Sequence, residues 1–297
     1  MQIVMTGGSR GIGAETLKHL VGQPSTRILL GVRGDTPAGT TGLPLDLSSI
    51  ASVNNFADAV LAALGSDLID ALVLNAGGQR PNVTQRSVDG HEMTFAANHL
   101  GHFLLLQRLW PRLASGARVV ITTSGTHDPE ERTGVPPPRH ANAAWLADPA
   151  ADPQCDANQI TAGMRAYSAS KLCNLMTASV AADRAAADPR GISVTAYDPG
   201  LTPGTGLARQ QMWVVRTFLW PLLPLLLPFG KTMNSLADAG RTLAELSIKL
   251  RPPSGRVYAS LRKGKLGWPN PSNLARDDAA CAALWHDSLA LCGLPAS

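Results

Sequence analysis

A glycine-rich turn directly after an apolar run constrains the fold of this chain more than any other sequence feature. Residues 2–6 have the composition of a buried strand, and a helical stretch near residues 11–21 follows. Glycines between the two allow a tight turn, a close approach to a pyrophosphate and close packing of helix on strand. The helix N-terminus offers free N–H groups and the positive end of its dipole. The turn therefore predicts a dinucleotide site that includes Gly7, Ser9, Arg10, Gly11, Ile12 and Gly13, with a purely structural turn as the alternative.

Short apolar runs alternate with amphipathic helical stretches along most of the 297 residues. Strands are expected at 2–6, 27–32, 71–74, 118–122, 193–197 and 255–259. Helices are expected near 11–21, 50–64, 92–113, 162–187, 234–249 and 277–291. This alternation predicts an α/β protein of one domain, 1–297, with a doubly wound Rossmann fold and a parallel seven-stranded sheet covered by helices on both faces. Ligands of such folds bind beyond the carboxyl ends of the strands.

Two segments interrupt the alternation. Residues 125–160 are rich in proline and predict a long insertion with little regular structure. Residues 201–233 contain an apolar run, 212–230, which Arg216 and three prolines make unsuitable as a membrane span. The run is either plain core or, in the interpretation we prefer, a mobile apolar lid over the pocket of a lipophilic substrate, able to touch a membrane surface.

Composition excludes several classes of protein. The net charge of +4 comes from scattered basic residues without a long Lys/Arg run, which argues against nucleic-acid binding. The four cysteines form no CxxC pair, and His99 and His102 have no third ligand nearby in the sequence, so we predict no metal site. A first strand that begins at Gln2 leaves no room for a signal peptide, and we expect a cytoplasmic protein.

Cofactor choice follows from charge at the end of the second expected strand. An NAD site usually has a carboxylate there to bind the ribose 2′-hydroxyl. Here the strand ends in Val32-Arg33, and Arg33 together with Arg10 can pair with a 2′-phosphate. Asp35, just beyond, is the one feature that favours NADH. The sequence predicts NADPH in preference to NADH.

Tyr167 and Lys171 stand four residues apart at the start of an expected helical stretch, so they share one helix face. A free tyrosine has a pKa of about 10 and is a poor acid-base group near neutrality. A neighbouring ammonium favours the phenolate and is expected to lower that pKa. The pair predicts a proton donor for a developing alkoxide; an exposed helical pair is the alternative.

These motifs occur in the order and approximate spacing of the short-chain dehydrogenase/reductase family, which the chain resembles over nearly its whole length. The resemblance implies that Tyr167 is the acid/base, that Lys171 is catalytic beside it, and that both side chains also bind the cofactor. It implies that Ser124 hydrogen-bonds the substrate carbonyl, with Thr123 as the rival for this position, and that Asn98 anchors a water in a proton relay or occupies a helix kink. It also implies contacts with the cofactor's adenine, central region and nicotinamide carboxamide for, respectively, Asp46 and Leu47; Asn75, Ala76 and Gly77; and Pro199, Gly200 and Thr202.

Residues 98–105, Asn-His-Leu-Gly-His-Phe-Leu-Leu, resemble the branch of retinol dehydrogenases and light-dependent protochlorophyllide reductases. The expected activity is NADPH-dependent hydride transfer to or from a lipophilic carbonyl or alcohol. Reduction of a conjugated double bond is an alternative, as is a non-catalytic protein that senses a dinucleotide. By the resemblance, subunits would associate through the helices at 92–113 and 162–187, and both a homo-oligomer and a monomer remain open.

Overall fold

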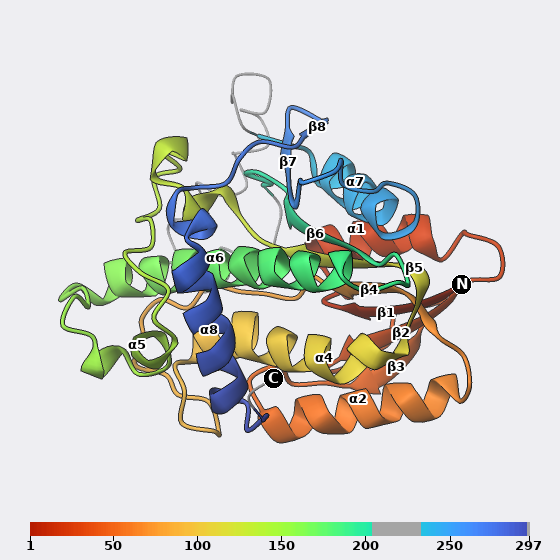
Figure 1. Ribbon diagram of the computed structural model, residues 1–297, viewed down its shortest axis with the longest axis horizontal. Helices are drawn as coiled ribbons and strands as arrows, with labels where there is room; N and C mark the ends of the chain where they lie inside the picture. Colours follow the sequence, from red (N-terminus) through yellow and green to blue (C-terminus); the bar gives the residue numbers. More distant parts are fainter. Residues whose placement is uncertain (204–232, 296–297) are drawn as a thin grey trace.

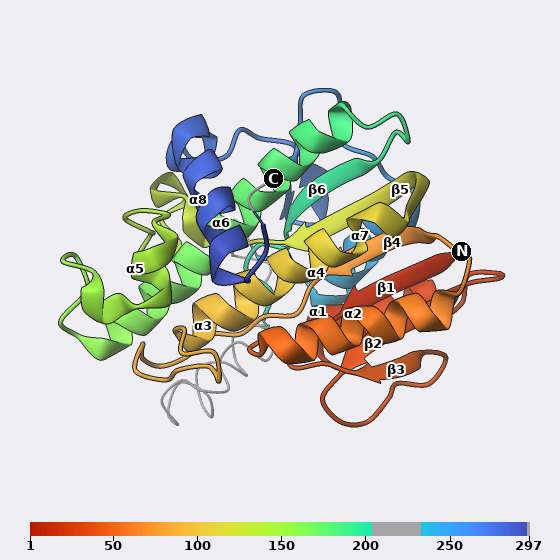
Figure 2. The same cartoon turned by 60° about the horizontal axis from the view of Figure 1, so that its bottom comes forward.

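A computed structural model describes residues 1–203 and 233–295 of the protein, and these form one sheet with helices on both faces (Figures 1 and 2). The strands are β1 (Gln2–Thr6), β2 (Arg27–Val32), β3 (Thr41–Pro44), β4 (Ile69–Leu74), β5 (Leu113–Thr122), β6 (Ser193–Asp198), β7 (Tyr258–Arg262) and β8 (Lys265–Gly267). Their order in the sheet is β3-β2-β1-β4-β5-β6-β7-β8. The first seven pair in parallel, which confirms the predicted doubly wound fold, and β8 adds an antiparallel edge that the sequence patterns did not predict.

The helices divide between the two faces of the sheet. The helices are α1 (Gly11–Leu20), α2 (Ile50–Leu64), α3 (Met93–Phe95), α4 (Gly101–Leu109), α5 (Ala143–Ala147), α6 (Gln159–Ala186), α7 (Leu236–Ile248) and α8 (Asp278–Leu291). Buried side chains of α1 and α7 pack on one face, and those of α2, α4, α6 and α8 belong to the core on the other. Because both faces are covered, the buried parts of the central strands, Ala71–Leu74 of β4 and Val119–Ile121 of β5, are continuous apolar runs.

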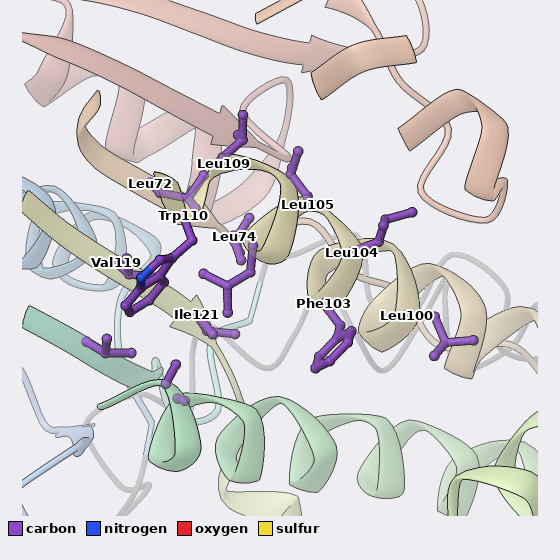
Figure 3. Close-up of a cluster of buried hydrophobic side chains, with 14 of the residues drawn as sticks. Leu72, Leu74, Leu100, Phe103, Leu104, Leu105, Leu109, Trp110, Val119 and Ile121 are labelled. Atoms are coloured by element: carbon purple, nitrogen blue, oxygen red, sulfur yellow. The ribbon is translucent and has the colours of Figure 1, made fainter. Parts of the chain in front are cut away.

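The larger core lies between the central strands and α4. Figure 3 shows side chains of this core, among them Leu105 and Leu109 of α4, Leu72 of β4 and Val119 of β5, all of them buried in one cluster. Burying a leucine side chain contributes about 1.5–3 kcal/mol relative to leaving it exposed. This packing fixes the positions of β4 and β5, and with them the edge of the sheet at which these strands end.

The expected helix near 92–113 is helical from Met93 to Arg112, but it is not α-helical throughout. A π-helical turn, Ala96–Leu100, separates α3 from α4, and a 3₁₀ turn, Trp110–Arg112, follows α4. Such π turns insert an extra residue into the helical ladder and are frequent at functional sites. Asn98, predicted as a possible kink residue, lies inside this turn.

Several elements differ from the sequence predictions: β4 begins at Ile69 instead of 71, and β5 begins at Leu113 instead of 118. Strand β7 covers Tyr258–Arg262, later than the expected 255–259, and β3 was not expected as a separate strand. The insertion 125–160 contains α5 and short 3₁₀ turns, and α6 begins within it at Gln159, so Tyr167 lies well inside a helix and not at its start. Short polar caps and prolines begin these turns locally, which the hydrophobic periodicity does not register.

The predicted lid has described residues only at its ends. Leu201 and Met233 pair as a parallel β-bridge, whereas 204–232, including the apolar run 212–230, lie outside the described residues. Among the helices of 1–203 and 233–295, none has the length and hydrophobicity that crossing a bilayer would need.

Helix α8 packs across α6 and α4. The ring of Trp285 meets the ring of Phe103 edge-on with centroids 5.0 Å apart, and Ser288 Oγ lies 2.9 Å from His99 Nε2. The chain's own C-terminal helix therefore occupies part of the surface on which the family resemblance placed a subunit contact.

A glycine in α4 tests how closely this helix approaches the sheet edge. A Cβ on Gly101 would lie 2.3 Å from the carbonyl oxygen of Leu47, a backbone atom that cannot simply move aside. Gly→Ala in an ordinary helix stabilises by about 0.5–1 kcal/mol. We expect Gly101→Ala instead to lower the free energy of unfolding by about 1–3 kcal/mol, measured by urea denaturation.

The matched control is Gly22→Ala, since a Cβ there meets nothing closer than 4.0 Å and its φ is not positive. Its stability should stay within about 0.5 kcal/mol of the parent protein. A stabilising Gly101→Ala would show that Leu47 and α4 are farther apart in solution than described.

Candidate active site

Four parallel strands end at one edge of the sheet, and the predicted site residues follow them. Gly7 comes after β1, Asn75 after β4, Thr123 after β5 and Pro199 after β6. Because parallel strands present their carboxyl ends at the same edge, residues as far apart in the chain as Gly7 and Pro199 meet there.

The glycine loop leaves room for a ligand because its backbone is folded tightly on itself. Gly7 has a φ of +73°, and a Cβ on it would lie 2.6 Å from the Cα of Ala76. A Cβ on Gly13 would lie 1.8 Å from the carbonyl oxygen of Gly7. Helix α1 then begins at Gly11, and Arg10 caps it without a side-chain hydrogen bond, which leaves the first N–H groups of the helix available to an anion.

The hydroxyl of Thr6 connects the glycine loop to the rest of the site. Its Oγ1 accepts hydrogen bonds from the backbone N–H groups of Asn75 and Ala76, each at 3.1 Å, and lies 2.9 Å from His102 Nε2. His102 Nδ1 lies 3.1 Å from the carbonyl oxygen of Asn98, which can only accept. The imidazole proton is therefore on Nδ1, and Thr6 donates its own proton to Nε2. Burial lowers the pKa of His102 to about 3, so this imidazole is neutral.

Asn98 holds the loop that follows β4. Its Oδ1 accepts from the N–H of Gly78 at 2.9 Å, and its Nδ2 donates to the carbonyl of Gly78 at 2.8 Å and to Ser170 Oγ at 3.0 Å. The Asn98 side-chain amide thus binds both the N–H and the carbonyl of Gly78 and connects this glycine to α6. Asn75 similarly donates from Nδ2 to the Gly7 carbonyl at 2.9 Å.

Tyr167 and Lys171 face the same edge from α6. Both are buried, and the ammonium of Lys171 lies 5.9 Å from the centre of the Tyr167 ring and donates to the carbonyl of Thr122 at 3.0 Å. Burial lowers the pKa of Lys171 to about 8, and the charge of Asp198 opposes this.

The expected lowering of the Tyr167 pKa is wrong for the described structure. Burial raises this pKa to about 12, against the lowering influence of a hydrogen bond with the Ser124 side chain. Desolvation of the phenolate is the larger effect because the phenol is buried, and the negative charge of Asp198 adds to it. Near neutral pH the phenol therefore carries its proton.

The hydrogen bonds distinguish Ser124 from its rival Thr123. Thr123 Oγ1 donates to the carbonyl of Lys171 at 2.7 Å, which ties β5 to α6 and occupies its proton. The Ser124 side chain instead lies close enough to the Tyr167 phenol to lower its pKa, and it accepts from the N–H of Thr126 at 3.3 Å. Ser124, and not Thr123, is thus the hydroxyl that lies beside the Tyr167 phenol.

The segment after β6 is held from two directions. Asp198 Oδ1 accepts from the N–H of Gly200 at 2.9 Å, and Thr202 Oγ1 donates to the carbonyl of Pro199 at 3.1 Å. Asn234, at the other end of the 204–232 segment, donates from Nδ2 to the same Pro199 carbonyl at 2.8 Å. Sequence reasoning did not single out Asp198 or Asn234; the only signal for Asp198 was a carboxylate directly before Pro-Gly at a strand end.

Positive charge gathers at the opposite end of the site, beyond β2. The pKa of Asp46 is lowered although partial burial raises it, because Ser48 donates hydrogen bonds to the carboxylate and the charges of Arg33 and Arg80 attract it. Arg33 and Arg80 therefore lie near Asp46, and sequence reasoning missed Arg80. In the part of the chain that the structure describes, the side chains of Arg10, Arg33 and Arg80 make no ion pair or hydrogen bond.

Comparisons with known proteins agree with this arrangement. A family model described as short chain dehydrogenase matches residues 1–133. Protochlorophyllide reductase of Avena sativa is 30% identical over 98% of this chain and 99% of its own length. Protochlorophyllide reductase A of Triticum aestivum is 29% identical over 98% of this chain and 80% of its own.

Two solved structures have the same fold. An uncharacterized protein from Mycobacterium Paratuberculosis superimposes with a TM-score of 0.69 at 26% identity, covering 100% of this chain and 94% of its own. An NADPH-bound carbonyl reductase from chicken fatty liver does so with a TM-score of 0.57 at 15% identity, covering 84% and 87%. The site residues lie at the carboxyl edge of the sheet, and the relative from Avena sativa is 30% identical over 98% of the chain. The chain therefore belongs to the short-chain dehydrogenase family of oxidoreductases.

Proposed function

We propose that the protein transfers a hydride between NADPH and a lipophilic carbonyl or alcohol, with Tyr167 as the proton donor and acceptor. One observation carries the proposal: the Tyr167 phenol, the Ser124 hydroxyl and the Lys171 ammonium lie together beside the glycine loops of β1 and β4. A non-catalytic sensor of dinucleotides would not need this group of three.

The residues at the sheet edge fit a phosphorylated dinucleotide. The open N-terminus of α1 and the space left by Gly7 and Gly13 suit a pyrophosphate. Arg10 and Arg33 would pair with a 2′-phosphate, and Arg80 lies close enough to Asp46 to contribute charge. Asn75, Ala76 and Gly77 would border the central region of the cofactor, and Pro199, Gly200 and Thr202 its carboxamide. The carbonyl reductase from chicken fatty liver, which has this fold, contains NADPH.

The cofactor, when bound, supplies the hydride. On the protein side, Ser124 would donate a hydrogen bond to the substrate oxygen and stabilise negative charge as it develops there. Tyr167 would then give its proton to the same oxygen, which completes the alcohol and leaves a phenolate. Lys171, buried beside the ring, would stabilise that phenolate, and Asn98 keeps the Gly77-Gly78 backbone in place next to the ammonium.

The lipophilic substrate is supported by the apolar composition of 212–230, which follows the Pro199–Thr202 segment in the sequence. A second candidate reaction is reduction of a conjugated double bond, because full-length relatives at about 30% identity are protochlorophyllide reductases. Co-purification of a red-absorbing pigment would favour that reaction, whereas NADPH oxidation with apolar ketones or aldehydes would favour the first.

Replacing Tyr167 tests the assignment of the proton donor. Tyr167→Phe should lower kcat for an apolar carbonyl about 10²- to 10⁴-fold, the usual contribution of a general acid, with little change in NADPH affinity. The measurement is NADPH oxidation at saturating cofactor, together with calorimetric binding.

Tyr197→Phe is the matched control, because its buried phenol donates to the Ala239 carbonyl at 3.0 Å, away from the site. It should cost about 1 kcal/mol of stability and leave kcat within about twofold. Equal activity of Tyr167→Phe and Tyr197→Phe would refute the assigned donor.

The pH dependence should follow Lys171. Its pKa of about 8 means that the ammonium loses its proton as the pH rises through 8, while Tyr167, with a pKa of about 12, is still protonated. We expect kcat/KM for reduction of a non-titrating ketone to be level below pH 8 and to fall by about tenfold per pH unit above it. Lys171→Arg, whose charge persists, should remove that fall even if its overall rate is lower. A parent profile that stays level to pH 10 would contradict the role of Lys171.

Arg33 tests the choice of cofactor. Arg33→Ala should weaken NADPH binding about ten- to a hundredfold and change NADH binding little, because a charge-assisted contact to the 2′-phosphate is lost. Arg27→Ala, at the opposite end of the same strand, is the control and should bind both nucleotides as the parent does. Calorimetry with both nucleotides measures this, and equal losses for NADPH and NADH would assign Arg33 to another role.

A further inference from the structure

Asp198 is a buried carboxylate at the last position of β6, with 1% of its surface exposed. A carboxylate in such a place is costly unless it is paired and hydrogen-bonded. It directly precedes Pro199-Gly200, the segment that the proposed function places against the nicotinamide. Its partners therefore show what this position requires.

The two oxygens of Asp198 have separate partners. Oδ1 accepts from the N–H of Gly200 at 2.9 Å and so sets the turn of its own loop. Oδ2 is held by β7, which lies next to β6 in the sheet (Figure 1): Tyr258 Oη donates to it at 2.9 Å, and Arg262 Nη2 lies 2.9 Å away. One oxygen positions the loop, and the other fixes the carboxylate to the neighbouring strand.

Arg262 extends the contact to the 125–160 insertion. The same Nη2 donates to Glu131 Oε1 at 2.9 Å, in the 3₁₀ turn Pro129–Glu131. Gly125, next to Ser124, touches this pair, since a Cβ there would lie 2.9 Å from Arg262 Nη2 and 3.1 Å from Asp198 Oδ2. A continuous chain of contacts thus runs from Glu131 through Arg262 and Asp198 to Gly200.

Asp198 also acts on the buried acid pair through its charge. Its negative charge raises the pKa of Tyr167 and that of Lys171, and for Lys171 it opposes the effect of burial. The ionisable groups around the pair come from several elements: Asp198 from β6, Tyr258 and Arg262 from β7, His102 from α4, and His127 and Glu131 from the insertion. Among them, Asp198 is the carboxylate that acts on both Tyr167 and Lys171.

We propose that Asp198 is a positioning residue that fixes the Pro199–Thr202 segment and, through Arg262 and Glu131, makes the 125–160 insertion part of the catalytic framework. The proposal rests on the function proposed above, because it assigns that segment to the nicotinamide. It gives the proline-rich insertion a structural task that its sequence did not reveal.

Two single substitutions and their combination test the chain of contacts. Asp198→Asn keeps the volume and removes the charge; we expect kcat/KM to fall about ten- to a hundredfold and NADPH binding to weaken. Its basic pH limit should move to lower pH, since a charge that raises the pKa of Lys171 is gone. Glu131→Gln should lose about three- to fivefold in kcat/KM. The double variant should lose less than the product of the two, because both act through Arg262.

Glu130→Gln is the matched control: it removes the neighbouring exposed carboxylate of the same turn and should leave all three readouts unchanged. The proposal is overturned if folded Asp198→Asn binds NADPH and titrates as the parent does, or if Glu131→Gln equals Glu130→Gln. Should Asp198→Asn not fold, Glu131→Gln and Arg262→Lys still decide, because their side chains are partly exposed. We expect calorimetric NADPH binding to change little in Tyr167→Phe but to weaken in Asp198→Asn, so a wrong proton donor and a wrong role for Asp198 give different results.

Discussion

The three hydrogen bonds of the Thr6 hydroxyl connect the elements on which this site depends. The oxygen accepts from two consecutive backbone amides after β4, and its proton goes to a histidine of α4. All capacity of one buried hydroxyl is thereby used, so the β1 loop, the β4 loop and α4 keep one relative placement. Since His102 reaches on to the carbonyl of Asn98, the same connection extends to the π turn and, through the Asn98 amide, to α6.

Burial determines the chemistry of the ionisable groups more than their pairing does. Tyr167, Lys171 and His102 are all buried, and burial favours the neutral form of each group. It raises the pKa of Tyr167 and lowers the pKa of Lys171 and of His102. A protonated phenol beside a hydroxyl is arranged to donate, which suits reduction of a carbonyl. The buried carboxylate of Asp198 opposes this effect at Lys171, because its negative charge raises the pKa of the ammonium.

Local signals predicted the parts of the site that depend on neighbours in sequence. The glycine loop, the Tyr167/Lys171 spacing and the strands of the parallel sheet other than β3 were predicted, because turn geometry and hydrophobic period are local properties. The antiparallel strand β8 was not predicted, since three residues show no periodicity. The approach of Arg80 to Asp46 was also missed, because it comes from a contact between distant segments, whereas a helix kink at Asn98 was among the predictions.

The sequence by itself determined the fold class, the dinucleotide-type turn and the identity of the phenol and ammonium, because each is encoded by residues within a few positions of one another. Only the tertiary structure decided that Ser124, and not Thr123, lies beside the Tyr167 phenol, and that this phenol is protonated. It also decided that Asp198 connects the insertion to the Pro199–Thr202 segment. These outcomes depend on which side chains the packed core encloses and which hydrogen-bond partners remain for them. Side chains compete for burial and for hydrogen-bond partners in this way only after segments remote in the chain have been brought together.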